Sequence, residues 1–237
     1  MQILYAILTI ILAGSIAYLY GSLSNAILIG RIFYDTDIRE HGSKNAGGTN
    51  AGRVLGAKAG AAVIILDILK PIIVFWGLYG IFNFADFTAF TYTWVPHVTI
   101  FLSLFLLSVG HCWPIFFGFK GGKAVSVFSG LLFAINWLFS IAAFIMFGLL
   151  LIWKKKVSLC SIVVSATFAL LSWFYLIPQL EGFGFYPLLQ TSPLFGAVGY
   201  LAYAILLTIT ATELIFRHRG NIQRLLAGTE RTITWMK

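Results

Sequence analysis

The sequence predicts an all-α protein that crosses a membrane several times. Of its 237 residues, 59% are hydrophobic and only 10% are charged, whereas soluble domains carry about 25% charged residues. Several apolar stretches are long enough to cross about 30 Å of hydrocarbon as helices, most clearly residues 2–33 and 193–216. A soluble fold of this length could not bury so much apolar surface, so we expect a polytopic integral membrane protein.

Six helical segments follow from the apolar pattern. The first, residues 3–31, lacks a basic N-terminal region and is longer than a signal peptide, so we expect it to be retained as a membrane helix. The others are expected at residues 57–83, 97–113, 123–153, 157–177 and 192–216. The sequence shows no internal repeat and no soluble linker, and the simplest division is a single transmembrane domain over residues 1–237.

The distribution of lysine and arginine predicts how these helices are oriented. Apart from Lys70, the basic residues lie in four regions, 31–58, 120–123, 154–156 and 217–237. Two connections contain no lysine or arginine, 83–96 and 177–192. The positive-inside rule places the four basic regions in the cytoplasm and the two other connections outside. The second and third basic regions can share a side only if the chain crosses twice between them, with a turn at Asn136, which gives seven spans and an external N-terminus.

The net charge of +8 indicates the chemical class of the partners, and the number of cysteines limits disulfide and metal sites. The basic residues alternate with spanning segments and do not form a soluble basic surface, so we expect anionic lipid headgroups or anionic substrates and no nucleic acid. Cys112 and Cys160 are too few for a disulfide framework or a metal set, and we expect both to be inert packing residues.

The first basic region contains a segment, residues 37–53, that is dense in glycine, small polar residues and charge. Glycines allow backbone N–H groups to approach an anion closely, hydroxyl and amide side chains add donors, and Arg53 can grip phosphate oxygens with two N–H groups. Phosphate binding fits this chemistry. Composition alone fits equally well with a solvated loop whose glycines only turn the chain.

A second motif lies between two apolar segments and contains His111 followed by Phe119-Lys120-Gly121-Gly122-Lys123. Free N–H groups and the dipole at the start of the next helix favour anions. Gly-Gly-Lys lacks the spacing of a nucleotide P-loop and no strand precedes it, which excludes a nucleotide hydrolase. His111 by itself is more often an interfacial or capping residue than a catalytic base.

The third motif, residues 217–230, lies directly inside the final span. A positive-inside anchor would explain its arginines without catalysis. His218 and Asn221 are three residues apart, so we expect them on one helical face, where they could contact one phosphate or hydroxyl. The lysine triplet 154–156 is expected to anchor at headgroups, and the adjacent Ser158 and Ser161 are the better site candidates.

Taken in order, these motifs resemble the bacterial acyl-phosphate:glycerol-3-phosphate acyltransferase family of integral membrane enzymes. The resemblance runs from about Gly21 to Glu230 and rests on Gly21-Ser22, Gly30-Arg31, Asp37-Ile38-Arg39, Gly42-Ser43, Asn45, Thr49-Asn50, Arg53, Asp67 with Lys70, His111 with Pro114, Phe119 through Lys123, Val157-Ser158-Leu159 and His218 through Glu230. The sequence departs from the family pattern at three positions, Lys44, Gly48 and Ala124. If the glycine replaced by Ala124 needed a positive φ, alanine there would be strained.

The resemblance implies that glycerol 3-phosphate attacks an acyl phosphate through its 1-hydroxyl, giving lysophosphatidic acid and phosphate in the first acylation of phospholipid synthesis, with no metal or other cofactor. It implies catalytic roles for Ser43, Arg53, Lys123, His218 and Asn221, substrate contacts for Asn45, Thr49, Asn50, His111, Lys120, Gly121, Gly122 and Ser158, and structural roles for Asp67, Lys70 and Glu230. Gly121 and Gly122 are expected to offer backbone donors to the substrate. The implied location is the bacterial cell membrane, with the motif loops in the cytoplasm, membrane lipids as partners and no obligate protein partner.

The main alternative is an anion or phosphate-ester transporter, because a basic mouth and small-residue loops would look similar. A transporter would place charged or polar residues through the bilayer centre and not only at one face. Asp67 and Lys70 are the only strong candidates for such a path, and their spacing is that of a local ion pair. The enzyme is therefore the preferred interpretation.

Overall fold

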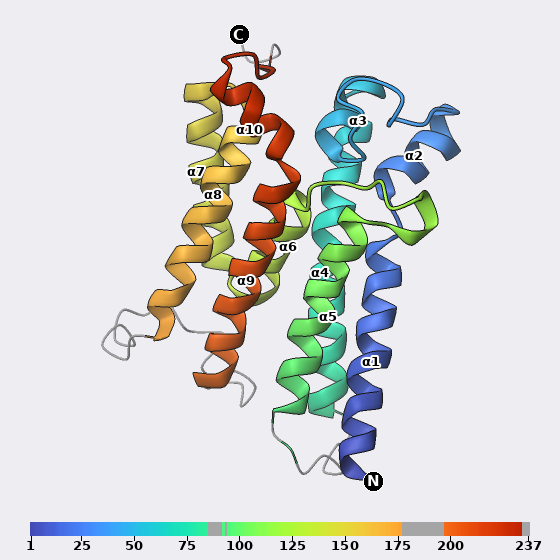
Figure 1. Ribbon diagram of the computed structural model, residues 1–237, viewed down its shortest axis with the longest axis vertical. Coiled ribbons are helices and arrows are strands. Elements are labelled where there is room, and N and C mark those ends of the chain that lie inside the picture. The colour runs from blue at the N-terminus through green and yellow to red at the C-terminus, as the bar shows by residue number, and fades with distance from the viewer. Residues whose placement is uncertain (85–91, 93, 177–196, 234–237) are drawn as a thin grey trace. The chain divides into compact units, whose positions relative to one another are not determined.

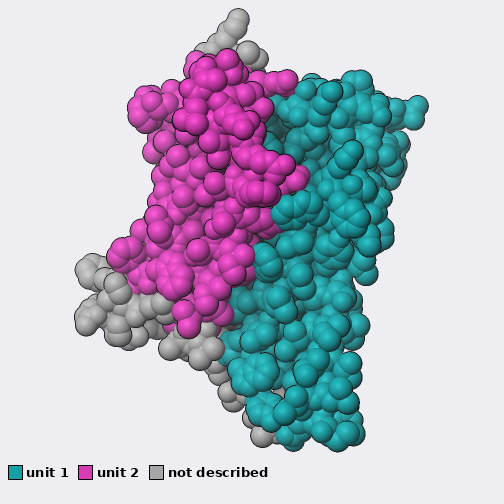
Figure 2. All heavy atoms as spheres, in the orientation of Figure 1, with its two compact units in different colours: residues 1–134 teal, residues 135–237 magenta. Residues whose placement is uncertain are grey.

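The computed structural model describes residues 1–84, 92, 94–176 and 197–233. Within these ranges the regular structure is entirely helical, which confirms the expected all-α fold. The chain divides into two compact units, residues 1–134 and residues 135–237, which are coloured separately in Figure 2.

In the first unit, α1 (Gln2–Gly21) and α5 (Val95–Cys112) run side by side (Figure 1). Their backbones approach closely because glycines lie at the contact: a Cβ added to Gly21 would be 2.2 Å from the Leu107 carbonyl oxygen. α4 (Ala57–Phe84) packs against both helices. α6 (Val125–Ile135) meets α4 in the same way, since a Cβ on Gly130 would be 2.3 Å from the Ile68 carbonyl oxygen. Small residues at close contacts are typical of helix packing in membranes.

The predicted continuous helix over residues 3–31 is wrong, because α1 ends at Gly21 and α2 (Asn25–Tyr34) begins after a break. The Ser22 hydroxyl donates back to the Tyr18 carbonyl oxygen (2.8 Å). In the break, the Leu23 carbonyl oxygen accepts a hydrogen bond from the buried Lys70 ammonium of α4. Serine competes for backbone hydrogen bonds and weakens a helix, which favours a break at this point. The break leaves the Leu23 carbonyl oxygen available as an acceptor for the buried Lys70 ammonium.

The predicted helix over residues 123–153 is divided into α6 and α7 (Trp137–Lys154), with the break at Asn136 as expected. The Asn136 side chain accepts a hydrogen bond from the Phe139 backbone N–H (3.1 Å) and so caps α7. Five described helices are long and apolar enough to cross a membrane, namely α1, α4, α5, α7 and α9 (Ala197–Arg217). At about 1.5 Å per residue, α6 and α8 (Val157–Ser172) are shorter than the roughly 30 Å of hydrocarbon that a spanning helix must cross. The count of seven spans therefore stays a prediction.

In the second unit, α8 packs between α7 and α9, followed by the 3-10 turn η3 (Trp173–Leu176) and, after α9, the short helix α10 (Arg219–Leu226). The chain then returns to the connection between α7 and α8. The Ile233 backbone N–H donates to the Lys155 carbonyl oxygen (2.9 Å), and the Ile233 side chain packs with Leu151 and Cys160. The lysine triplet and Ile233 thus lie at the same end of this unit.

Some sequence predictions lie outside the described residues. These are most of the two connections expected on the external side, with Asp86 and Glu181, and the first residues of the helix expected at 192–216. Cys112 and Cys160 are both fully buried in apolar clusters, consistent with packing roles.

Candidate active site

The first loop (residues 35–47) leads from α2 into the short helix α3 (Gly48–Val54), and the buried side chain of Asn50 holds its shape. Asn50 Oδ1 accepts from the Ser43 backbone N–H (2.7 Å), and Nδ2 donates to the carbonyl oxygens of Ile38 (2.8 Å) and His41 (3.2 Å). These bonds fix the turn that presents Ser43 at the surface. The sequence predicts a substrate contact for Asn50, whereas the structure uses both ends of its amide inside the loop.

The other candidate side chains of this region are accessible to a ligand. Ser43, Thr49 and Arg53 are exposed, and Asn45 is half-buried. Thr49 and Arg53 lie one turn apart on α3, on the same side of the helix. The first loop and α3 therefore combine two hydroxyls, an amide and a guanidinium over a short stretch of surface.

The departure from the family pattern at Gly48 has a packing explanation. A Cβ at Gly48 would lie 2.3 Å from Ile64 Cγ1 of α4, so the space that an alanine methyl would need is already filled. One turn later α3 and α4 touch through two glycines, since a Cβ on Gly60 would lie 2.6 Å from Gly52 Cα. α3 is held against α4 by this close contact.

The second loop (residues 113–124), which includes the 3-10 turn η2 (Ile115–Phe117), folds back over the end of α5. The Gly121 N–H donates to the Cys112 carbonyl oxygen (3.3 Å), and the Gly122 N–H donates to the His111 carbonyl oxygen (3.0 Å). A Cβ on Gly122 would lie 2.1 Å from His111 Nε2. Close approach to His111 therefore explains both glycines, and the structure differs from the prediction of exposed donors because both N–H groups are used within the chain.

Two of the departures from the family pattern fall where the backbone is left-handed. Lys44 in the first loop and Ala124 at the end of the second both have a φ of 58°. A non-glycine residue in this region costs about 1–2 kcal/mol, so the strain anticipated for Ala124 is present. In the second loop Lys120 is exposed and Lys123 half-buried.

A buried polar cluster connects the start of α2, the middle of α4 and the end of α5. The predicted ion pair is present: Lys70 Nζ lies 3.3 Å from Asp67 Oδ1, and both side chains are 2% exposed. Asn25 Nδ2 donates to the same carboxylate oxygen (2.8 Å), and His111 Nδ1 lies 3.9 Å from it. Buried charges persist when they are paired and hydrogen-bonded. Lys70 and Asn25 therefore satisfy the buried Asp67 carboxylate within the helix bundle.

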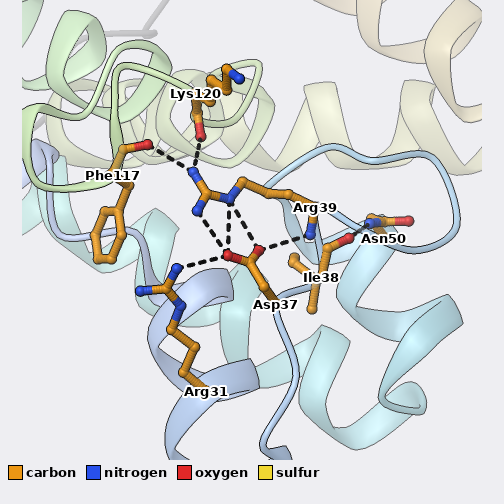
Figure 3. A network of polar contacts seen from close by, with 7 residues as sticks. All are labelled: Arg31, Asp37, Ile38, Arg39, Asn50, Phe117 and Lys120. Carbon is orange, nitrogen blue, oxygen red and sulfur yellow. Dashed lines mark hydrogen bonds and ion pairs between the residues drawn. The ribbon is translucent and has the colours of Figure 1, made fainter.

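Arg39 connects the two loops, and sequence reasoning did not assign it to the site (Figure 3). Its Nη1 donates to the carbonyl oxygens of Phe117 (2.7 Å) and Lys120 (3.4 Å) in the second loop. Its Nη2 donates to Asp37 Oδ2 (2.7 Å), which also accepts from Arg31 (2.9 Å). The Arg39 guanidinium and, less strongly, Arg31 hold the pKa of Asp37 well below its ordinary value, so this carboxylate is ionised at neutral pH.

In the second unit, Glu230 accepts hydrogen bonds from Ser158 and Asn221, two side chains that the sequence assigns to the substrate. Ser158 Oγ (2.7 Å) and Asn221 Nδ2 (2.6 Å) both donate to Glu230 Oε1, and Arg224 Nε donates to Oε2 (2.8 Å). Burial acts to raise the pKa of Glu230, but these hydrogen bonds outweigh it and the pKa is lowered. Glu230 thus ties α8, α10 and the C-terminal segment together, and Ser158 and Asn221 here bind a carboxylate in place of a phosphate.

His218 lies at the junction of α9 and α10 and is 3% exposed. Its Nδ1 is 2.8 Å from the Leu214 carbonyl oxygen, which can only accept a hydrogen bond, so Nδ1 carries the hydrogen. In the neutral imidazole this leaves Nε2 as the basic nitrogen. The tautomer suits a histidine that takes a proton.

Together these features give each unit a distinct chemistry. The first unit carries cationic and hydroxyl side chains on two joined loops, and the second carries a histidine with a defined tautomer beside a fixed carboxylate network. Among the described residues, no cluster of three or more histidine, cysteine, aspartate or glutamate side chains could hold a metal ion. The side chains that are present are those that bind anions.

Comparisons with known proteins agree with this chemistry. The family model for glycerol-3-phosphate acyltransferase matches residues 11–228. The chain is 34% identical over 230 residues to the glycerol-3-phosphate acyltransferase of Listeria welshimeri, covering 97% of this chain and 99% of the relative. It is 35% identical over 248 residues to the enzyme of the same name from Mycoplasmopsis synoviae, covering both chains completely.

Two crystal structures of PlsY, an integral membrane glycerol 3-phosphate acyltransferase, are similar to this chain at 30% identity, covering 97% of this chain and 96% of PlsY. The TM-score is 0.70 for the glycerol 3-phosphate form and 0.68 for the lysophosphatidic acid form. The family model covers most of the chain and the relatives cover nearly all of it. This chain therefore belongs to the glycerol-3-phosphate acyltransferase family.

Proposed function

We propose that this enzyme takes its acyl group from an acyl phosphate and transfers it to the 1-hydroxyl of glycerol 3-phosphate, releasing inorganic phosphate. Family membership makes the chain a membrane-embedded enzyme that acylates glycerol 3-phosphate; the acyl donor and the residue roles are our proposal. The observation that carries it is the pair of joined loops in the first unit. The first loop carries Ser43 and leads into α3 with Arg53, and the second loop carries Lys120 and Lys123.

In the proposed reaction, the hydroxyl oxygen of glycerol 3-phosphate attacks the carbonyl carbon of the acyl phosphate. A carbon–oxygen ester bond forms, the bond between the carbonyl carbon and the phosphate oxygen breaks, and phosphate leaves with the electron pair. Negative charge grows on the leaving group as this bond breaks. Cations held in fixed positions stabilise that charge more in the transition state than in the ground state.

The residue roles follow from this charge distribution. We assign Arg53 to a bidentate phosphate contact and Lys120 and Lys123 to point-charge contacts. Ser43 is assigned as a hydrogen-bond donor to phosphate and not as a covalent nucleophile, because an acyl phosphate is already activated. Asn45 and Thr49 are further donors for the same anions.

The proton of the attacking hydroxyl must be transferred to an acceptor, and two groups could accept it. His218 is suited to the role, because its Nδ1 donates to Leu214 and its Nε2 is the basic nitrogen of the neutral ring. A phosphate oxygen of the substrate is the other candidate acceptor. The apolar acyl chain would remain among the membrane helices, with the motif loops on the cytoplasmic side of a bacterial cell membrane and no protein partner needed.

The test is an assay of purified protein in lipid nanodiscs with acyl phosphate and labelled glycerol 3-phosphate, following labelled lysophosphatidic acid and free phosphate together. Arg53→Ala and His218→Ala should each lower kcat/KM by about 10- to 100-fold or more, the effect expected for losing a contact to a charged group. Lys58→Ala is the matched control, because Lys58 is exposed and lies outside the proposed contacts. A wild type that acylates glycerol 3-phosphate from an acyl thioester but not from acyl phosphate would refute the proposed donor.

A further inference from the structure

The two phosphate-handling loops are far apart in the sequence, yet one side chain bonds to both. Arg39 lies in the first loop and donates to the Phe117 carbonyl oxygen of the second, 78 residues away. Its Nη1 also reaches the Lys120 carbonyl oxygen (3.4 Å). Figure 3 shows the guanidinium between the two loops, with its other edge facing Asp37. Arginine suits this position because its planar fork offers five N–H donors in fixed directions.

Asp37 orients the guanidinium. Its Oδ1 accepts from both the backbone N–H of Arg39 (3.0 Å) and Arg39 Nε (3.0 Å), and Oδ2 accepts from Nη2 (2.7 Å). The two side chains are only 13% and 20% exposed, so the pair is largely shielded from water. Contact with Asp37 raises the pKa of Arg39, as contact with Arg39 lowers that of Asp37, so both remain charged.

The second loop needs a contact from outside the loop because part of its backbone adopts a left-handed conformation that most residues disfavour. Gly118, Phe119 and Ala124 have φ values of 65°, 59° and 58°. Glycine adopts this conformation freely, but the other two pay about 1–2 kcal/mol each. Strained positions persist only when their surroundings hold them. The carbonyl groups that Arg39 binds flank Phe119 on both sides.

We propose that Asp37 and Arg39 form a positioning clamp that fixes the second loop, with Lys120 and Lys123, against the first loop, with Ser43, and the adjoining α3, with Arg53. This inference rests on the proposed function, because it assigns the clamp to the same phosphate contacts. Arg39 binds the backbone of Lys120 and leaves that ammonium exposed. The clamp therefore acts through other residues, and Arg39 is a positioning residue.

The clamp makes a specific demand on residue type. A lysine at position 39 keeps the positive charge and can pair with Asp37, but its single ammonium cannot face a carboxylate and two carbonyl groups as the guanidinium does. Arg31 provides the matched control. It also donates to Asp37 (2.9 Å), but among the described residues it donates to no carbonyl group of the second loop. Arg31→Gln removes one arginine from Asp37 and the guanidinium that lies 5.8 Å from the Phe117 ring centroid, but it leaves both hydrogen bonds from Arg39 to the second loop.

The first measurement is the distance between spin labels on His41→Cys and Phe116→Cys, one in each loop and both exposed. The native cysteines are fully buried and stay in place. In lipid nanodiscs the distance distribution should be narrow in the wild-type background and clearly broader in Arg39→Gln and Arg39→Lys. It should broaden much less in Arg31→Gln, which loses only the contact with the Phe117 ring. A distribution that stays narrow in both Arg39 variants overturns the clamp, whatever the activity.

The second measurement is the affinity for labelled glycerol 3-phosphate, with kcat and KM in the acyl phosphate assay and the thermal unfolding midpoint of each variant. Loss of charge-assisted hydrogen bonds should weaken binding about tenfold or more in Arg39→Gln while the unfolding midpoint stays close to wild type. A broadened distance distribution with unchanged glycerol 3-phosphate affinity and unchanged kcat/KM overturns the positioning role. A wild type that binds glycerol 3-phosphate but does not use acyl phosphate refutes the proposed donor alone, because the binding measurement still tests the clamp.

Discussion

Replacing Gly121 with alanine is expected to displace the second loop and lower the activity while leaving the helices folded. The new Cβ would lie 2.2 Å from the His111 carbonyl oxygen, 2.5 Å from Pro114 Cδ and 3.0 Å from the Cys112 carbonyl oxygen, whereas ordinary contacts of a Cβ begin near 3.4 Å. The His111 carbonyl belongs to the last turn of α5 and is backbone, so it cannot rotate away. The loop must move instead, by about 1 Å.

The magnitude follows from that displacement. The hydrogen bond from the Gly121 N–H to the Cys112 carbonyl oxygen is already long, at 3.3 Å, and would be lost. Such a loss removes about 1 kcal/mol of stability, which lowers the unfolding midpoint of a protein of this size by about 2–4 °C. Catalysis is more sensitive, since a misplacement of about 1 Å can cost about 100-fold in rate. Lys120 and Lys123 flank the two glycines and would move with them.

The assay is kcat/KM for glycerol 3-phosphate in lipid nanodiscs, measured beside the unfolding midpoint. Gly77→Ala is the matched control. Gly77 lies within α4, an added Cβ meets nothing within 4 Å, and alanine favours the helix by about 1 kcal/mol. Gly121→Ala should therefore lose activity and Gly77→Ala should keep it. If Gly121→Ala is folded and as active as the wild type, the close packing on His111 does not position the loop.

Three further predictions concern stability, each measured by unfolding in detergent or lipid. Lys70→Met leaves the Asp67 carboxylate buried beside neutral groups and should lower the free energy of unfolding by about 3–5 kcal/mol. The double variant with Asp67→Asn should recover most of this loss. A double variant as unstable as Lys70→Met would contradict the pairing. Lys44→Gly should raise the unfolding free energy by about 1 kcal/mol by removing a left-handed side chain, and no gain would mean that Lys44 is unstrained. The pKa of Asp37 is depressed, so its stabilisation is present above the ordinary value of 3.8 and is lost as the pH falls through the folded-state pKa. The wild type should therefore lose stability below about pH 4, and Asp37→Asn should lack this part of the loss.

The helices were largely predictable because hydropathy is a local property. The helix expected at 57–83 is found at Ala57–Phe84, and the break expected at Asn136 is where α7 begins. The error at residues 22–24 has a different origin. The residues on both sides are apolar enough to predict one helix across Ser22 and Ser24, but Lys70 of α4 takes the Leu23 carbonyl oxygen as a partner. A break stabilised by a residue of another helix leaves no signal in local hydropathy.

The site was predictable as a set of loops but not as a set of contacts. Motif order identified the segments that carry Ser43, Arg53 and Lys123, because residue types suited to phosphate recur there. Which polar groups face a ligand depends on what each meets after folding. Asn50 holds the first loop, and the Gly121 and Gly122 N–H groups bind the end of α5. Spacing alone cannot distinguish a donor to substrate from a donor that shapes the loop.

The charge balance explains why cations remain available to bind anions. Sixteen lysine and arginine residues face eight aspartate and glutamate residues, so carboxylates of the chain can neutralise at most half of the cations. Three of those carboxylates, on Asp37, Asp67 and Glu230, each pair with a basic side chain and also accept from groups elsewhere in their unit. Each therefore holds structure in place and leaves other cations for anions.

A membrane-orientation signal requires only that cations be numerous on one side, whereas a site requires that they be held in position. Lys154 lies 3.4 Å from the ring centroid of Trp153, which is 71% exposed, and this arrangement suits an anchor at the membrane surface. Lys120 differs, because Arg39 binds its backbone while its ammonium remains exposed. An orientation signal would tolerate displacement of Lys120 by several ångströms, but a phosphate contact would not. Loss of the clamp at constant net charge, as in Arg39→Lys, therefore separates the two roles of the basic residues.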